Sequence, residues 1–326
     1  MVASLEVMPG HPRPEVVDLR FLRPDHLANL LDEETRLWRE TLDWNFRHSA
    51  DLLTKFLGTR SLSGYALLAA DQAVGYSYYV VEDSKALIGD LFVAEHFRTA
   101  ECQHLLFATI VGALMTTPFV RRIECQLMLA PPLVAQAAPA ASYLRVFGRH
   151  FMSIECGRAA GLKPDRKHPN VVVEGWSSRF QEAAAQLIAE GYAGHVDAQI
   201  NDQYQSVPGA RRFLHNIIQY PGCGAFLGPA SFLAFSADSV RPCGLILASL
   251  VNERVGHITQ VCVLPSHRGK GVGFELLRRS LKSMAEAGCR SVSLSVSAAN
   301  RGALTLYEGL GFRTVREYQA LTWAGF

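Results

Sequence analysis

The chain has 326 residues, of which 49% are hydrophobic and 19% are charged, and its formal net charge is +2. This length predicts about two domains, because single hydrophobic cores rarely grow beyond about 250–300 residues. Lys and Arg number 18 against 19 Asp and Glu in residues 1–170, and 14 against 11 in the remainder. Neither half therefore carries the basic stripe that is typical of nucleic-acid binding.

Seven cysteines are scattered along the sequence without C-x-x-C or other metal-ligand spacing. Their odd number argues against a disulfide framework, and nothing in their pattern predicts a metal site. The sequence shows no signal-peptide pattern and no apolar run of membrane-spanning length. We therefore expect a cytoplasmic protein that uses no metal, nucleic-acid partner or membrane.

The first half predicts an alternation of strands and helices after a proline-containing leader over residues 1–14. Residues 130–141, which are rich in Pro and Ala, indicate a loop. The hydrophobic periodicity predicts strands at 15–22, 64–70, 74–81, 86–93 and 122–129, and helices at 25–39, 49–56 and 100–115.

The second half repeats this order of elements. Placing Val93 on Val263 gives an offset of 170 residues, at which Arg98 falls on Arg268. We interpret this as two copies of one α/β (α+β) fold in tandem, each a mixed sheet flanked by helices, with domains at 1–168 and 169–326. The predicted strands are 172–176, 232–236, 245–250, 258–263 and 291–296, and the predicted helices are 178–190, 209–219 and 274–287.

One glycine-rich stretch organises the second copy. A strand ends at Pro265, the glycines 269, 271 and 273 follow at every second position, and a helix begins after them. Glycines let a backbone approach a ligand closely, and a helix start presents unpaired amides that favour a pyrophosphate. A Rossmann site would instead need G-x-G-x-x-G and an acidic residue about 20 residues later. Four basic residues add positive charge nearby: Arg268, Lys270, Arg278 and Arg279.

The run Arg268-Gly269-Lys270-Gly271-Val272-Gly273 resembles the acetyl-CoA signature R/Q-x-x-G-x-G/A of the GCN5-related N-acetyltransferases, or GNAT superfamily. Downstream, Asn300 and residues 303–312 resemble the family's N-x-x-A-x-x-L-Y-x-x-x-G-F element. The resemblance implies two tandem GNAT folds and acetyl-CoA as the co-substrate. It also implies direct transfer of an acetyl group to a primary amine on a small molecule or peptide.

The resemblance further implies roles for individual residues. The strand before the turn would bond the pantetheine chain, and the turn amides would meet the pyrophosphate. Tyr307 stands where the family often places a general acid for the departing thiolate. His257 stands near the position of a glutamate base in some relatives, although water is an alternative base. The implied cofactor-binding residues are Val261, Cys262, Val263, Arg268, Gly269, Lys270, Gly271, Val272, Gly273 and Asn300.

The first copy lacks these features. At the offset of 170, the three glycines correspond to Thr99, Glu101 and Gln103, and a carboxylate at a helix start repels an anion. We expect this copy to be a degenerate scaffold or substrate wall. The acceptor would be chosen by residues 190–226, which include His195, Asp197 and Tyr204. The alternative function is a non-catalytic acyl-CoA-binding sensor or regulatory module.

Overall fold

The computed structural model describes residues 14–131, 134, 136–159, 162–163, 171–220, 222, 224–237 and 239–326. The chain divides into two compact units. Unit 1 comprises the described residues up to Thr41, Asn45–Val146 and Tyr318–Phe326, and unit 2 comprises Leu42–Trp44 and Phe147–Glu317.

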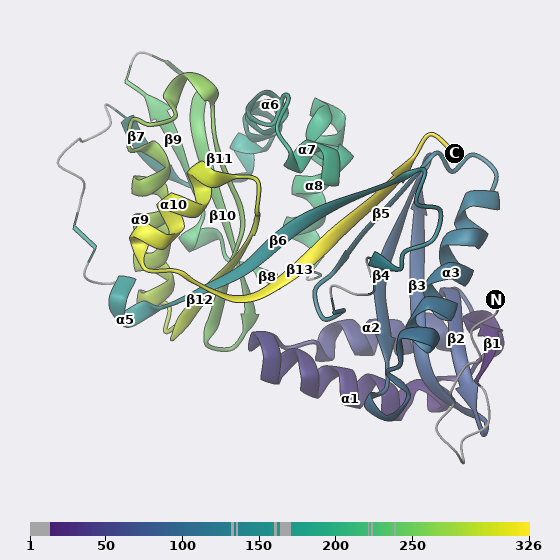
Figure 1. Ribbon diagram of the computed structural model, residues 1–326. Coiled ribbons are helices and arrows are strands. Elements are labelled where there is room, and N and C mark those ends of the chain that lie inside the picture. The colour runs from purple at the N-terminus through teal and green to yellow at the C-terminus, as the bar shows by residue number, and fades with distance from the viewer. Residues whose placement is uncertain are drawn as a thin grey trace. The chain divides into compact units, whose positions relative to one another are not determined.

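Unit 1 is built on a mixed sheet with the strand order β1-β2-β3-β4-β5-β13 (Figure 1). Its strands pair antiparallel except for β4 and β5, which are parallel. The predicted strand over 15–22 is shorter than expected, because a 3-10 turn over Leu19–Phe21 follows β1. The elements are β1 Glu15–Asp18, α1 Pro24–Leu42, α2 Arg47–Gly58, β2 Ser63–Ala69, β3 Gln72–Glu82, β4 Lys85–Val93, α3 Ala100–Thr116 and β5 Arg122–Leu127.

The strands of unit 2 also form a mixed arrangement, with the order β6-β12-β11-β10-β9-β7 and β8 paired to β10. Among the described strands of unit 2, only β11 and β12 pair parallel. The elements are β6 Leu144–Glu155, α5 Cys156–Ala159, β7 Val171–Gly175, α6 Gln181–Gly191, α7 Asp197–Ile200, α8 Val207–Gln219, β8 Ala225–Phe226, β9 Phe232–Ser236, β10 Pro242–Asn252, β11 Val255–Val263, α9 Val272–Glu286, β12 Ser291–Ser297, α10 Arg301–Leu310 and β13 Arg313–Ala324.

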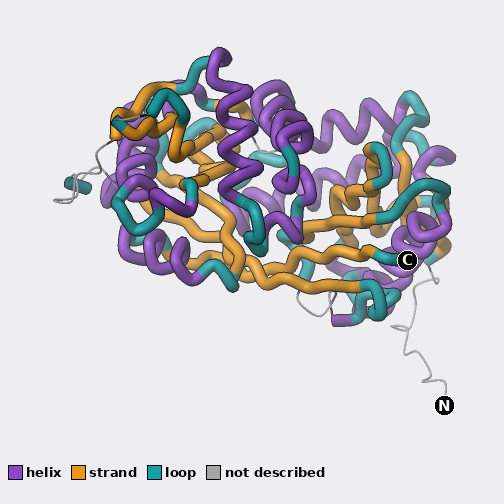
Figure 2. The backbone as a smooth tube through the Cα atoms, turned by 90° about the horizontal axis from the view of Figure 1, so that it is seen from above, coloured by secondary structure: helices purple, strands orange, loops and turns teal. Residues whose placement is uncertain are grey.

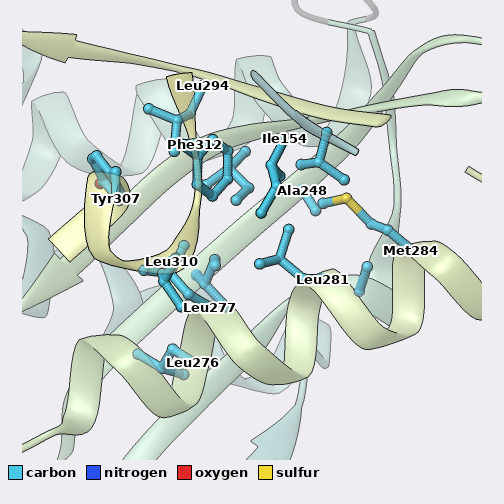
Figure 3. Close-up of a cluster of buried hydrophobic side chains, with 14 of the residues drawn as sticks. Ile154, Ala248, Leu276, Leu277, Leu281, Met284, Leu294, Tyr307, Leu310 and Phe312 are labelled. Atoms are coloured by element: carbon cyan, nitrogen blue, oxygen red, sulfur yellow. The ribbon is translucent and has the colours of Figure 1, made fainter. Parts of the chain in front are cut away.

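Two hydrophobic cores cover the two faces of the sheet in unit 2. Because side chains alternate along a strand, Ile246 and Ala248 of β10 pack with α9 and α10, whereas Leu245 and Leu247 pack with α6 and α8. Figure 2 shows helices on both sides of these strands. Figure 3 shows the first core, in which Leu277 and other residues of α9 face the sheet. We call the opposite face, covered by α6 and α8, the α6 face.

Each unit is completed by a strand from the other half of the sequence. Strand β6 pairs with β12 of unit 2 over seven residues, from Arg149 with Ser297 to Glu155 with Ser291. The last six residues of β13 pair with β5 of unit 1. The predicted boundary between 168 and 169 therefore differs from the observed division, because backbone pairing exchanges these two strands. The catalytic and degenerate roles of the two halves stay predictions.

The two units nevertheless repeat the same local geometry. Arg98 Nε donates to the carbonyl of Val93 at 2.9 Å, and Arg268 Nε donates to that of Val263 at 3.0 Å. Gly75 pairs with Val93, just as Gly244 pairs with Val263. These contacts reproduce the offset of 170 residues that the sequence indicates, with the same one-residue slip between the paired strands.

No helix in the described part of the chain is long and apolar enough to cross a membrane. The described residues also contain no group of three or more His, Cys, Asp or Glu side chains that would hold a metal ion.

Candidate functional site

Strands β11 and β12 of unit 2 pair over only part of their length. The parallel register runs from Val255 with Ser291 to Ile258 with Leu294. Strand β11 then continues to Val263, and a bulge at Thr259 interrupts its pairing with β10. The last five residues of β11 thus have an edge that is not paired with β12. Backbone groups on such an edge are available to bond an extended ligand.

The predicted glycine turn follows this strand. Gly269 and Gly271 have φ values of +71° and +83°, which explains the choice of glycine at both positions. Helix α9 begins at Val272 with Gly271 as its N-cap, and no side chain caps it. Its first helical bond runs from Glu275 N to Gly271 O. The preceding amides of the first turn are therefore positioned to bind an anion.

The basic side chains near the turn are partly engaged within the protein. The guanidinium of Arg268 donates to the carbonyls of Val263 and Gly191, the latter at 2.6 Å from Nη2. Arg278 and Arg279 both donate to Glu275. Hydrogen bonding to Arg278 and then Arg279 lowers the pKa of Glu275 to about 2. The positive charge of these two arginines is thus partly offset by the single carboxylate of Glu275, which was not considered in the sequence.

The three predicted pantetheine-binding residues form the end of β11, which pairs with β10 and not with β12. The carbonyl of Val261 accepts a hydrogen bond from Tyr192 Oη at 3.3 Å. Cys262 is buried against α6, with its Sγ 3.8 Å from the carbonyl oxygen of Leu187. Burial raises the pKa of the Cys262 thiol to about 12, so the thiol is a core side chain and not a nucleophile.

Tyr307 lies on α10, at one end of the core in Figure 3. It is 8% exposed, and its ring packs 5.8 Å from that of Phe312. Burial, followed by the negative charge of Asp197, raises the pKa of Tyr307. The phenol therefore stays protonated and able to donate. Asn300 caps this helix by accepting from Ala303 N at 3.2 Å, so its side chain orients α10.

A half-buried polar cluster lies near enough to Tyr307 for its charges to act on the phenol. Arg149 Nη1 contacts Asp197 Oδ1 at 2.8 Å and Ser297 Oγ at 3.0 Å, and Ser297 also bonds the Asp197 carboxylate. Asp197 N donates to His195 Nδ1 at 3.1 Å. Burial, followed by the charges of Arg268 and Arg149, lowers the pKa of His195 against the opposing effect of Asp197. The cluster thus neutralises the Asp197 carboxylate.

His257 does not have the environment expected of a base. It is 6% exposed, its Nδ1 lies 2.9 Å from Ser293 Oγ, and its ring stacks on Phe151 at 6.2 Å and packs against Trp44 at 4.9 Å. Burial lowers its pKa to about 4. A group with this pKa is a weak proton acceptor at neutral pH. The surroundings of His257 therefore favour a role in core packing over the predicted role of catalytic base.

Three side chains near these residues were not singled out by the sequence: Tyr192, Gln260 and Arg149. Tyr192 stacks on Tyr204 with ring centres 4.6 Å apart, and Tyr204 Oη lies 3.5 Å from Gln260 Oε1. Tyr192 lies within the predicted acceptor segment 190–226, and Arg149 lies on β6, where no strand was predicted. The sequence did offer a signal for Gln260, because a polar residue there interrupts an otherwise apolar strand.

Comparisons with known proteins show similarity over parts of the chain and in the fold. Residues 198–312 match the model of the Acetyltransferase (GNAT) family. The chain is similar to the N-alpha-acetyltransferase MAK3 of Arabidopsis thaliana, with 38% identity over 84 residues, which are 25% of this chain and 43% of that protein. The chain thus spans less than half the length of this relative.

Two solved structures share the fold over nearly the whole chain. A GCN5-related N-acetyltransferase from Sphaerobacter thermophilus has a TM-score of 0.67 and 17% identity, with 95% of both chains covered. A tandem GNAT protein from the clavulanic acid biosynthesis pathway has a TM-score of 0.61 and 14% identity, with 96% of this chain and 98% of that chain covered. The predicted α/β fold class, with mixed sheets flanked by helices, is confirmed.

Proposed function

The chain belongs to the GNAT superfamily, and on that premise we propose that it transfers an acetyl group from acetyl-CoA to a primary amine. One observation carries the proposal: after one 3-10 turn, an uncapped helix start with left-handed glycines follows the end of β11, whose edge toward β12 is unpaired. This combination suits a pyrophosphate joined to an extended chain. Unit 2 would be the catalytic unit.

The residues of unit 2 fit acetyl-CoA as co-substrate. The amides at the start of α9 would bind the pyrophosphate, and the edge of β11 from Val261 to Val263 would bond the pantetheine amides. The bound thioester would supply the acyl group. Side chains at Gly269 and Gly271 would be strained because of the positive φ values there.

Transfer would be direct, because the Cys262 thiol is buried with a raised pKa. The neutral amine would attack the carbonyl carbon, forming the C–N bond as the C–S bond breaks. Tyr307 would give its proton to the departing thiolate, and the proton released by the amine would pass to solvent, from which Tyr307 recovers one. No protein base is assigned, because the lowered pKa of His257 makes it a weak proton acceptor at neutral pH.

The proposed acceptor is the α-amino group of a peptide or a related small amine. Support comes from the similarity to an N-alpha-acetyltransferase and from the position of Tyr192 and Tyr204 beside β11. An aromatic pair offers flat apolar surface to the carbon skeleton of an amine without fixing its charge.

The test is release of free thiol from acetyl-CoA with a panel of amines that includes peptides. We expect release that depends on the amine and is lost in Gly271→Glu. Binding of acetyl-CoA without release for any amine would contradict catalysis and support the sensor alternative. Absence of binding would contradict both.

A further inference from the structure

Gln260 lies on β11 immediately after the bulge at Thr259, one residue before the proposed pantetheine-binding edge. Its side chain is on the α6 face and is 5% exposed. Its amide Nε2 has no hydrogen-bond partner among the described residues. Burying an amide without a partner is unfavourable, so such a group in a folded protein calls for an explanation.

The described groups around Gln260 do not satisfy this amide. Tyr204 Oη lies 3.5 Å from the other end of the side chain, at Oε1. The Tyr204 contact therefore fixes one end of Gln260 and leaves the N–H groups unused. On the adjacent strand β10, Ser249 Oγ is also fully buried without a partner in the described structure. Two unpaired polar groups on neighbouring strands of one face are unlike a hydrophobic core.

The equivalent position in unit 1 shows the contrast. At the offset of 170 residues, Gln260 corresponds to Asp90, which also follows a bulge in its strand. Asp90 is 7% exposed, but its Oδ1 accepts from Leu91 N at 2.7 Å, and its carboxyl also bonds Glu34. A buried polar residue at this position is thus satisfied by the protein in unit 1 and left unsatisfied in unit 2.

We propose that the side-chain amide of Gln260 donates a hydrogen bond to a carbonyl oxygen of the reactants. An amide N–H is a donor only, so it binds an oxygen and repels an ammonium group. Two reactant carbonyls fit this chemistry: that of the thioester, and one adjacent to the amine of the acceptor. Gln260 would be a specificity or catalytic residue of the acetyl transfer. This inference rests on the proposed function.

The experiment compares Gln260→Met with wild type on two amines, phenylalanine amide and 2-phenylethylamine, which differ by one carboxamide. Methionine has a similar length and no N–H donor. If Gln260 binds the acceptor carbonyl, kcat/KM falls roughly tenfold for phenylalanine amide and is unchanged for 2-phenylethylamine. If it binds the thioester carbonyl, kcat falls about 10²-fold or more for both amines. Either result supports the proposal.

Thermal unfolding gives a second readout that needs no acceptor. Removing an unpaired buried amide should raise the melting temperature of Gln260→Met by about 2–4 °C. A variant that is less active yet more stable is not expected if the glutamine is merely structural. A fall in melting temperature would contradict the unpaired state of the amide.

Two further variants sharpen the result. Gln260→Glu keeps an oxygen for Tyr204 and removes the donors, so it should lose activity as Gln260→Met does. Gln103→Met replaces a buried glutamine of α3 in unit 1 and should leave acetyl transfer unchanged. Wild-type kcat/KM for both amines in Gln260→Met would overturn the inference. Wild-type protein that acetylates no amine would instead contradict the proposed function.

Discussion

Units 1 and 2 have the same strand geometry but different chemistry at the helix that follows it. In unit 1, Thr99 caps α3 by accepting from Cys102 N at 3.2 Å, whereas in unit 2 the N-cap of α9 is Gly271, which has no side chain. The arginine contact at the strand end is the same in both units. The arginine contact that ties the turn to the strand is thus present in both units. A helix start without a side-chain cap, which leaves amides free to bind a ligand, is found at α9 of unit 2 and not at α3 of unit 1.

The two units also differ in how their polar side chains are bonded beside the bulge in the central strand. In unit 2, Gln260 Nε2 has no partner among the described residues. In unit 1 the ring of Tyr78 lies against Gly89, where an added Cβ would be 2.1 Å from the tyrosine Cζ. Glu34 accepts from Tyr76 Oη at 2.6 Å and from Trp38 Nε1 at 3.2 Å. This region of unit 1 is filled by mutually bonded side chains. Two units that share a fold therefore need not bind the same ligand.

The largest expected effect comes from making unit 2 resemble unit 1 at the turn. Gly271→Glu introduces a side chain at φ +83° and a carboxylate beside the anion-binding amides. We expect acetyl-CoA binding and thiol release to be abolished. Circular dichroism should show an unchanged fold, and Glu101→Gln in unit 1 is the matched control, which should bind normally. If Gly271→Glu kept micromolar affinity for acetyl-CoA, the proposed difference in cofactor binding between the two units would be contradicted.

The next effect concerns the proton donor of unit 2. Tyr307→Phe removes the phenol and keeps the ring that packs on Phe312. Since general acids contribute about 10²–10⁴-fold, kcat should fall by at least 10²-fold with acetyl-CoA affinity little changed. Single-turnover rates and a calorimetric titration would separate the two quantities. Near-normal kcat would show that another group, such as water, protonates the thiolate.

His257→Gln should change stability and leave the pH dependence of catalysis intact. Because the pKa of His257 is about 4 in the folded protein, against an ordinary value of about 6.5, the unfolded chain binds a proton first. Wild type should therefore lose up to about 3 kcal/mol of stability as the pH falls from about 6.5 to 4. The variant should lose less. If the acidic limb of its pH–rate profile moves instead, His257 is a base after all.

The smallest effect on acetyl transfer is expected for Glu34→Gln in unit 1. Burial, with the nearby Asp90 charge, raises the pKa of Glu34 well above its ordinary value, so the folded state keeps a proton that the unfolded chain releases. Wild type should lose stability as the pH rises above about 4.5. The variant should show a weaker pH dependence and normal acetyl-CoA affinity. If the free energy of unfolding depended on pH equally in wild type and in Glu34→Gln, the raised pKa of Glu34 would be contradicted.

Local features of the site were predictable from the sequence. The order of strand, glycine turn and helix around Gly269 and Gly271 was predicted from residues that are adjacent in sequence. The cap at Asn300 was not predicted, because the resemblance assigned this residue to cofactor binding. The positions of Arg98 and Arg268 also reveal the repeat.

Non-local pairing could not be read in this way. No strand was predicted over 144–155 or 313–324, so the exchange of β6 and β13 between the units was missed. The contact of Arg149 with Asp197 was missed with it. Burial decides the behaviour of His257 and Gln260, and burial depends on packing from distant segments such as Trp44 and Tyr204.

The central claim is that only unit 2 binds acetyl-CoA. Isothermal titration calorimetry of the wild-type chain with acetyl-CoA measures the number of sites per chain directly. The difference between the capped start of α3 and the uncapped start of α9 predicts one site per chain. Two sites per chain, or one site that survives in Gly271→Glu and is lost on substitution of Thr99, would contradict it.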